Sequence, residues 1–310
     1  MSFTETGTET AERAEWFAVH VYLPYSLQTA FLCEDVAPLV GDLGARGRFF
    51  FLRYWKGGPH LRLRFDGRHT QVGPEEVVER LESLVPHGDQ EARGQYDLQA
   101  ASQAGLARME NEEVMAARPF GAVERFDYLP EYDKYGGPQG IEIAETVFCD
   151  TSGAVLDLLA ATRRSTTMPV GEAVRAMAMS LRGVGLSAEE SVPLLRGYEQ
   201  RWSAFLPESS DAGWNSMYDK ARDGLVNMCR KIWGPTEGDA FSDAYATATA
   251  RARALFGEGP DQRLTDIRMP GTSYMECVAQ YLHTTNNRLG LVPAGEALAA
   301  HLMHCALQEL

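Results

Sequence analysis

The chain has 310 residues, of which 45% are hydrophobic, and a formal net charge of -14 at pH 7. This length and composition indicate a globular protein with one large core or two modest ones. The negative charge disfavours nucleic acid as a partner, because lysine and arginine supply most of the affinity for phosphate.

The sequence shows no sign of a membrane or secreted protein. No apolar run is long enough to span a bilayer, and the first fifteen residues, MSFTETGTETAERAE, lack the basic and then apolar character of a signal peptide. The five cysteines are scattered and odd in number, which favours reduced thiols over a disulfide framework. We therefore expect a cytoplasmic protein.

Residues 16–150 are predicted to form an α+β part with an antiparallel sheet. The segment 16–23, WFAVHVYL, has the aromatic and β-branched density of a strand, and residues 30–47 have helical spacing that ends at glycine. Residues 48–65, RFFFLRYWKGGPHLRLRF, predict a β-hairpin that turns at Gly-Gly-Pro. Residues 73–85 predict a helix with acidic residues near its start.

Residues 151–310 are predicted to be mainly helical. Apolar residues recur at intervals of three and four between Gly or Pro breakers. The pattern begins within residues 140–164 and continues in 169–185, 187–206, 213–233, 239–256, 272–290 and 293–310. No repeat or low-complexity linker separates the two parts, so residues 1–310 are expected to form a single unit.

The second arm of the predicted hairpin carries two arginines on one face. Strand alternation directs Arg62 and Arg64 to one side and Leu61, Leu63 and Phe65 to the other. One interpretation is a solvated sheet face. The other is a pair of guanidinium groups that bind a carboxylate or an enolate oxygen.

Residues 126–140, FDYLPEYDKYGGPQG, predict a structured loop that leads into a helix. Aromatic and ionisable side chains gathered on such a loop are typical of a binding site, although a tyrosine-rich surface turn is the alternative. The residues concerned are Tyr128, Glu131, Tyr132, Asp133, Lys134 and Tyr135.

A helix over residues 273–288 would place His283 on one face with Glu276, Gln280 and Asn287. Tyr274, Cys277, Tyr281 and Arg288 would lie on a neighbouring face. A histidine flanked by amides is a candidate proton shuttle, and a purely structural histidine is the alternative.

His301, His304 and Cys305 lie close together in the segment HLMHC and could contact one metal ion. Zinc needs three or four ligands, and the sequence offers no second cluster that matches this one. We therefore interpret the segment as a helix-packing motif and predict no metal site. The usual binding patterns for organic cofactors are not found either.

Three of these segments, in this order, resemble one family. They are RFFFLRYWKGGPHLRLRF, YLPEYDKYGGPQGIEIAETVFCDTSGAVLDLL and YLHTTNNRLG. The chain resembles, over nearly its whole length, the C-terminal glutamate-elimination domain of lantibiotic dehydratases and its free-standing relatives in thiopeptide biosynthesis.

The resemblance implies specific roles for residues of the three segments. In the elimination domains, arginines of the HLRLR strand, an arginine of the tyrosine loop and the histidine of the third segment act on glutamylated serine or threonine. The matching residues are Arg62, Arg64, Lys134 and His283, with Glu131 in the same loop. Lys134 departs from the family pattern and lacks the two-pronged guanidinium that would grip a departing glutamate.

Two reactions are associated with this family. One is β-elimination of glutamate, and the other is the pyridine synthase reaction, which joins two dehydroalanines by a formal aza-[4+2] cycloaddition. Loss of water and of the leader peptide then makes the ring aromatic. The Lys134 departure and the hydroxyl- and amide-rich third segment favour the pyridine synthase. The elimination enzyme is the alternative, and a peptide-binding scaffold without chemistry is a third interpretation.

This interpretation assigns two sets of site residues, no metal and no cofactor. The predicted catalytic residues are His283, Arg62, Arg64, Tyr274 and Tyr281. The predicted substrate-binding residues are Glu131, Tyr132, Lys134, Tyr135, Asn286, Asn287 and Arg288. The implied partner is a modified precursor peptide with its leader, and a homodimer is left open.

Overall fold

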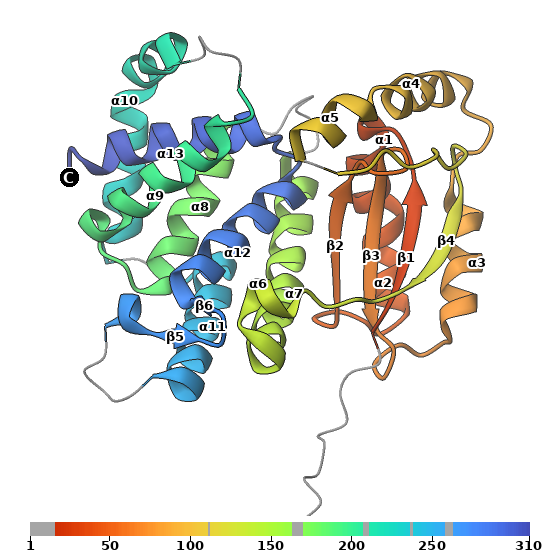
Figure 1. The fold of residues 1–310 in the computed structure, drawn as a ribbon, viewed down its shortest axis with the longest axis horizontal. Coiled ribbons are helices and arrows are strands. Elements are labelled where there is room, and N and C mark those ends of the chain that lie inside the picture. Colours follow the sequence, from red (N-terminus) through yellow and green to blue (C-terminus); the bar gives the residue numbers. More distant parts are fainter. Residues whose placement is uncertain (1–15, 111, 163–169, 207–210, 236–237, 258–262) are drawn as a thin grey trace, which may run out of the picture.

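A computed structural model describes residues 16–110, 112–162, 170–206, 211–235, 238–257 and 263–310 (Figure 1). The expected opening segment 1–15 lies outside these residues. The predicted α+β class is confirmed: an antiparallel sheet is followed by a mainly helical half.

The sheet has four antiparallel strands in the order β2-β3-β1-β4. They are β1 (Trp16–Tyr22), β2 (Phe49–Tyr54), β3 (His60–Asp66) and β4 (Val123–Asp127). The hairpin β2–β3 turns through Gly57 and Gly58, which both have positive φ values. A Cβ at Gly58 would lie 2.2 Å from the Oη of Tyr96, so this position requires glycine.

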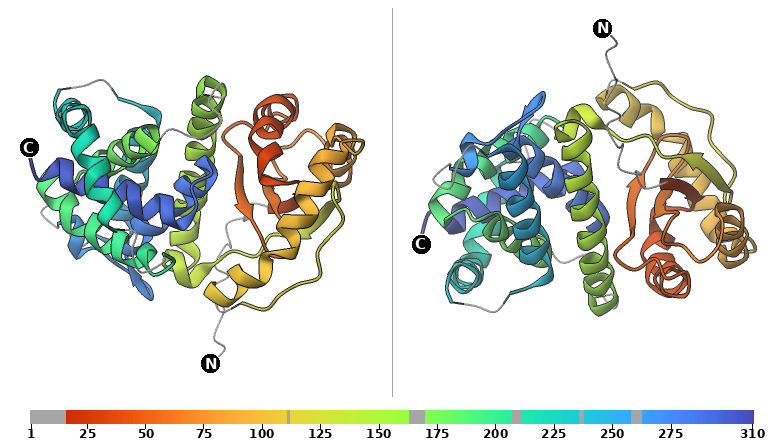
Figure 2. Two further views of the ribbon diagram at one scale, coloured as in Figure 1. Left: turned by 90° about the horizontal axis from the view of Figure 1, so that it is seen from above. Right: turned by 90° about the horizontal axis from the view of Figure 1, so that it is seen from below.

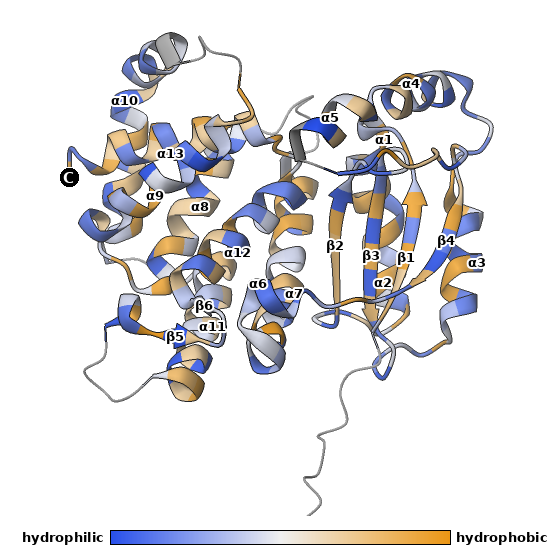
Figure 3. Cartoon of the chain, viewed as in Figure 1, coloured by the Kyte–Doolittle hydropathy of each residue, from blue (hydrophilic) through white to orange (hydrophobic). Residues whose placement is uncertain are grey.

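Strand alternation divides the sheet into an apolar face and a mixed face. The apolar face, which includes Val19, Leu61, Leu63 and Phe65, shares a core with the helices packed on it. Those helices are α1 (Tyr25–Phe31), the π-helix η1 (Leu32–Val36), α2 (Ala37–Asp42) and α3 (Pro74–Leu84). Figure 2 shows α1 and α2 against one side of the sheet, and Figure 3 shows hydrophilic positions within its strands. The predicted helix over 30–47 therefore begins earlier and is interrupted by a π-turn.

The stretch between α3 and β4 contains two further helices that the sequence did not predict. These are α4 (Gln90–Ala101) and α5 (Gln103–Glu110). After β4, the tyrosine loop forms one helical turn, α6 (Tyr132–Tyr135), and a left-handed Gly136 ends it. A Cβ at Gly136 would lie 2.7 Å from the Cβ of Met269, so the loop also needs glycine here for close packing.

The helical half consists of α7 (Gly137–Thr162), α8 (Val170–Val184), α9 (Ala188–Ser203), α10 (Asp211–Trp233), α11 (Ala240–Phe256), α12 (Tyr274–Leu289) and α13 (Pro293–Leu307). Three short elements, η2 (Leu264–Asp266), β5 (Arg268–Met269) and β6 (Thr272–Ser273), precede α12. No helix in the described ranges is long and apolar enough to cross a membrane.

The helix α7 joins the two halves. It passes through residue 150 without a break, so the change from sheet to helices comes at Gly137. Its residues Ala154, Val155 and Leu159 belong to the core under the sheet, whereas Val147 and Phe148 belong to the helical core. The sheet and the helices are therefore packed against a common central helix.

Candidate active site

The mixed face of the sheet carries the two predicted arginines of β3. In the strand register, Arg64 lies between Ala18 of β1 and Phe50 of β2. Arg62 lies between His20 of β1 and Leu52 of β2. This arrangement agrees with the alternation predicted from the sequence and places both guanidinium groups on the side opposite the apolar core.

Arg64 lies at a small cavity where the sheet, the tyrosine loop and two helices meet. Its guanidinium carbon is 5.3 Å from the ring centroids of both Phe50 and Tyr128. The buried Nε has no hydrogen-bond acceptor among the described residues. The cavity has a volume of about 30 Å³ and is lined by Leu52, Arg64, Tyr128, Leu129, Glu131, Tyr135, Ile141, Phe148 and Thr284. It therefore offers a cationic donor to a group of about the size of one carbonyl oxygen.

The charge of this face is not neutralised by ion pairs. None of the ion pairs between described residues involves Arg62 or Arg64. Burial lowers the pKa of both guanidinium groups, which still leaves arginine protonated. The face can consequently stabilise an oxygen that gains negative charge.

Two histidines accompany the arginines. Nδ1 of His60 lies 2.8 Å from the carbonyl oxygen of Gly58, and Nε of Arg62 donates to Nε2 of His60 over 3.2 Å. The ring of His20 stacks on His60 at 4.8 Å and on Phe126 at 4.1 Å. Burial lowers the pKa of His60 to about 3 and that of His20 to about 2, so both imidazoles are neutral at pH 7.

His20 was missed as a site residue in the sequence. The alternation of the segment 16–22 would have directed it to the face opposite Phe17, Val19 and Val21. The missing information was the register, since only pairing with β3 places His20 opposite Arg62.

Two of the predicted substrate-binding residues of the tyrosine loop line the cavity, as does Tyr128 of the same loop. Glu131 and Tyr135 line it, and Tyr135 stacks on Tyr281 at 5.9 Å between centroids. Lys134 is not among the lining residues: its Nζ lies 2.5 Å from Oε1 of Glu131. Tyr132 is half-buried and packs against the helical core. The side chain of Lys134 is 54% exposed.

His283 lies on a half-buried stripe of α12, directly before the cavity residue Thr284. Its Nδ1 is 3.0 Å from Oε1 of Glu296, and its ring stacks on Trp202 at 4.3 Å. The side chain is 30% exposed. Because Nδ1–H is directed to the carboxylate, Nε2 is the nitrogen available for proton transfer.

A buried network fixes the carboxylate that orients His283. Glu296, which is only 1% exposed, also accepts hydrogen bonds from the hydroxyl of Tyr198 and from Nδ2 of Asn286. Neither Glu296 nor Tyr198 was singled out in the sequence. Glu296 is an acidic residue in the first turn of an otherwise apolar helix, which is the one signal the sequence held.

Two further predicted residues of α12 bond to other elements, and one of them, Arg288, is fully buried. Arg288 donates to the carbonyl oxygen of Phe51 at 2.9 Å and to Oγ1 of Thr151 at 3.0 Å. Asn287 bonds to both backbone groups of Arg53. These contacts attach α12 to β2. They hold Thr284 beside the mixed face of the sheet, which carries Arg62 and Arg64 and is called the arginine face below.

Tyr274 and Tyr281 are fully buried in the helical core. The hydroxyl of Tyr274 lies 2.9 Å from Oγ1 of Thr249, and the hydroxyl of Tyr281 has no hydrogen-bond partner among the described residues. Burial raises the pKa of both phenols. Neither residue lines the cavity at Arg64, although Tyr281 stacks on Tyr135, which does.

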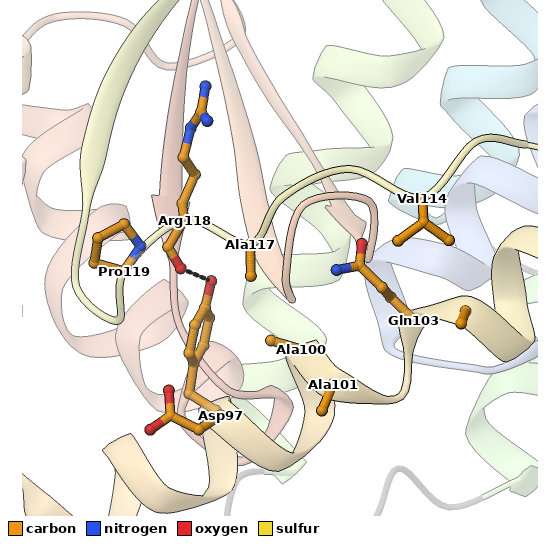
Figure 4. Close-up of a pocket in the computed structure, with 10 residues that line it drawn as sticks. Asp97, Ala100, Ala101, Gln103, Val114, Ala117, Arg118 and Pro119 are labelled. Carbon is orange, nitrogen blue, oxygen red and sulfur yellow. Dashed lines mark hydrogen bonds between the residues drawn. The ribbon is translucent and has the colours of Figure 1, made fainter.

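A second, larger cavity of about 560 Å³ lies at the hairpin end of the sheet, between α4, α5 and the segment 112–119 (Figure 4). Its wall is largely apolar, with Ala100, Ala101, Val114 and Ala117. The hydroxyl of Tyr96 donates to the carbonyl oxygen of Arg118 at 2.8 Å and so ties the segment to α4.

Comparison with known proteins agrees with this architecture. A family model described as "Lantibiotic biosynthesis dehydratase C-term" matches residues 16–307. Nisin biosynthesis protein NisB from Lactococcus lactis subsp. lactis is 25% identical over 148 residues, which are 47% of this chain and 12% of NisB. The chain therefore spans only a small part of that curated relative.

Two solved structures share the fold. The pyridine synthase TbtD from thiomuracin biosynthesis superimposes with a TM-score of 0.68 and 18% identity, over 96% of this chain and 98% of that chain. The tRNA-dependent lantibiotic dehydratase MibB from Microbispora sp. 107891 has a TM-score of 0.53 and 21% identity, over 98% of this chain and 29% of that chain. The resemblance seen in the three sequence segments is confirmed, and the protein belongs to the lantibiotic biosynthesis dehydratase C-terminal family.

Proposed function

We propose that the protein is a pyridine synthase that acts on a ribosomally made precursor peptide. It would join two dehydroalanines in a formal aza-[4+2] cycloaddition and then release water and the leader peptide. The observation that carries this proposal is the cavity at Arg64: the side chain lines a space of carbonyl size, and its buried Nε has no hydrogen-bond acceptor among the described residues. Cycloaddition requires an amide to react as its iminol, and a cation at the amide oxygen favours that form.

Arg62 and Arg64 would hold substrate amide oxygens on the mixed face of the sheet. Arg62 is kept in place from two sides, by His60 at its Nε and by the ring of Tyr54, which lies 3.5 Å from its guanidinium carbon. Such fixed donors stabilise developing charge without reorganising during the reaction. Holding both alkenes against one rigid face also supplies the proximity that the reaction needs.

His283 would move protons from α12, where it is next in sequence to the cavity residue Thr284, although it does not itself line the cavity. Glu296 fixes its tautomer and would stabilise the imidazolium that forms when Nε2 takes up a proton. Proton transfer is needed at three stages: to form the iminol, to release water and to release the leader. Tyr198 and Asn286 act as positioning residues through Glu296.

The position of Lys134 favours cycloaddition over glutamate elimination. An eliminase needs a cation for the departing glutamate carboxylate, and the family uses an arginine at this place in the loop. Here the lysine is half-exposed and paired with Glu131, and it does not line the cavity. The higher TM-score to the pyridine synthase than to the dehydratase adds support.

The cavity of Figure 4 is our candidate for the leader peptide. It is about twenty times larger than the space at Arg64 and has an apolar wall suited to side chains of a bound segment. Met115, next to the lining residue Val114, is 45% exposed and extends the apolar surface beyond the cavity. The hairpin β2–β3 connects this region to the arginine face.

The test uses two peptides with the same leader. One carries a glutamylated serine, and the other carries two dehydroalanines with azoles in place. The proposal predicts that the purified protein consumes only the second peptide. Glutamate loss from the first peptide alone would replace the proposal with the elimination enzyme, and leader binding without turnover of either would favour the scaffold.

A further inference from the structure

A cluster of metal-binding side chains lies far from the arginine face, between α9, α10 and α13. Figure 1 shows these three helices together on the side of the molecule away from the sheet. His301, His304 and Cys305 of α13 each place one donor atom within 4.8 Å of the other two. The sequence alone showed these three residues, but nothing that completed the site.

The structure adds a carboxylate that holds both imidazoles. Nδ1 of His301 lies 3.0 Å from Oε1 of Glu199, and Nε2 of His304 lies 2.6 Å from Oε2 of the same residue. Each histidine thus uses one ring nitrogen for Glu199 and keeps the other for a further bond. Carboxylate–histidine pairs of this kind orient the imidazole ligands of zinc.

Two distances around Nε2 of His301 are close to the edges of a zinc tetrahedron. Sγ of Cys305 is 3.8 Å away, and Oδ1 of Asn215 on α10 is 3.2 Å away. Zinc bonds to nitrogen, oxygen and sulfur imply edges of about 3.3–3.6 Å. The two observed distances lie within about 0.2 Å of that range.

The nitrogen Nδ1 of His304 is a second, independent indication of a metal site. This nitrogen is buried and has no hydrogen-bond partner within the described part of the chain. A buried nitrogen without a partner costs free energy unless something binds it. The side chains of His301 and His304 are 12% and 10% exposed, so the cluster lies just beneath the surface, within reach of an entering ion.

We propose that His301, His304 and Cys305, with Asn215 in the oxygen position, bind one zinc ion, and that Glu199 positions the two histidines. The ion would connect α10 to α13 directly and α9 through Glu199. It would therefore act as a structural element of the helical half and take no part in the peptide chemistry. This proposal does not depend on the proposed function.

The test is metal binding by the full chain. Protein freed of metal with a chelator is reloaded with zinc, and its metal content is measured; cobalt(II) replaces zinc for absorbance spectroscopy. We expect one zinc per chain and a thiolate-to-cobalt absorption band. Cys305→Ser should lose that band and bind zinc at least tenfold more weakly, and Glu199→Gln should weaken binding about 10- to 100-fold.

The matched control is Cys33→Ser, because Cys33 is also a half-buried cysteine outside any disulfide but lies in η1. This variant should keep the cobalt band and the zinc affinity. Circular dichroism identifies any variant that fails to fold, and His301→Gln then takes the place of Cys305→Ser. A zinc content well below one per chain, or a cobalt band unchanged in both Cys305→Ser and His301→Gln, would overturn the assignment.

Discussion

Nε of Arg62 donates a hydrogen bond to Nε2 of His60 over 3.2 Å, two residues apart on the same face of β3. His60 can accept this bond because its Nδ1–H is directed to the carbonyl oxygen of Gly58. The hairpin turn therefore orients the neutral imidazole of His60 through Gly58. His60 in turn orients the guanidinium group of Arg62. The same contact connects the stability of the sheet to pH.

The lowered pKa of His60 should make the protein less stable in mild acid. Its pKa falls from 6.5 to about 3 on folding, so below pH 6.5 the unfolded chain binds a proton that the folded chain does not. The free energy of unfolding should then fall with falling pH, by at most about 1.4 kcal/mol per pH unit for this residue. Urea unfolding at pH 7.5 and 5.5 measures the difference, which should shrink in His60→Gln. An equal pH dependence of stability in the unmodified protein and in His60→Gln would contradict the assignment of this effect to His60.

Arg64→Met should separate activity from stability. The substitution removes a largely buried cation that forms no ion pair with a described carboxylate, and methionine fills a similar volume. We expect turnover of the bis-dehydroalanine peptide to fall about 100-fold or more and the melting temperature to rise by about 1–2 °C. Steady-state kinetics and thermal unfolding measure the two effects.

Arg125→Gln is the control for that substitution. Arg125 lies on β4 of the same sheet, but its side chain is 48% exposed and pairs with Glu75. Turnover should stay close to that of the unmodified protein. An equal loss of turnover in both variants would mean that the general charge of the sheet matters and the cavity does not.

His283→Ala should lower turnover about 100-fold, in the range usual for loss of a general acid or base. Gln280→Ala is the matched control, because Gln280 lies one turn earlier on the same half-buried stripe of α12. It should change turnover by less than threefold. Full activity of His283→Ala, in a protein shown to be folded, would remove this histidine from the catalytic residues.

Lys134→Ala distinguishes the two reactions of the family. The lysine is exposed and bound to Glu131, so its loss should leave cycloaddition within about threefold of the original rate. In an elimination enzyme the same change would remove the cation for the departing glutamate and reduce turnover strongly. Rates for both peptides, measured by mass spectrometry, give the answer.

Val114→Asp should weaken leader binding through the larger cavity. Val114 lines that cavity and is 56% exposed, so a carboxylate there places charge on an apolar wall with little risk to folding. Leu98→Asp is the control, since Leu98 is 75% exposed on α4 and does not line the cavity. Isothermal titration with leader peptide should show at least tenfold weaker binding for Val114→Asp alone. Equal affinities of the Val114→Asp and Leu98→Asp variants for the leader would mean that the leader binds outside this cavity.

The regular parts of the fold could be predicted because local patterns determine them. The alternation of Leu61, Arg62, Leu63 and Arg64 fixed the hairpin faces, and apolar spacing identified α8 to α13. The helices α4 and α5 were missed because their apolar positions are few; only Ala92, Tyr96 and Ala100 of α4 are buried. The pattern of charged residues alone did not predict α4 and α5.

The partners of the site residues could not be predicted, because they come from distant parts of the chain. His283 was visible in the sequence, but Trp202 and Glu296 meet it only through the packing of α9 and α13 on α12. In the same way, the contact of His301 and His304 with Glu199 could not be predicted, because Glu199 lies about a hundred residues earlier. Tertiary contacts of this kind leave little trace in a single sequence.

We expect the arginine face to promote ring formation in a substrate with two dehydroalanines. Mass spectrometry of that peptide after incubation with the purified protein tests it most directly. We expect two peptide products in equal amounts. One is the released leader peptide, and the other is a core peptide whose mass equals that of the substrate less the leader and one water. An unchanged substrate, together with loss of glutamate from the glutamylated peptide, would contradict it.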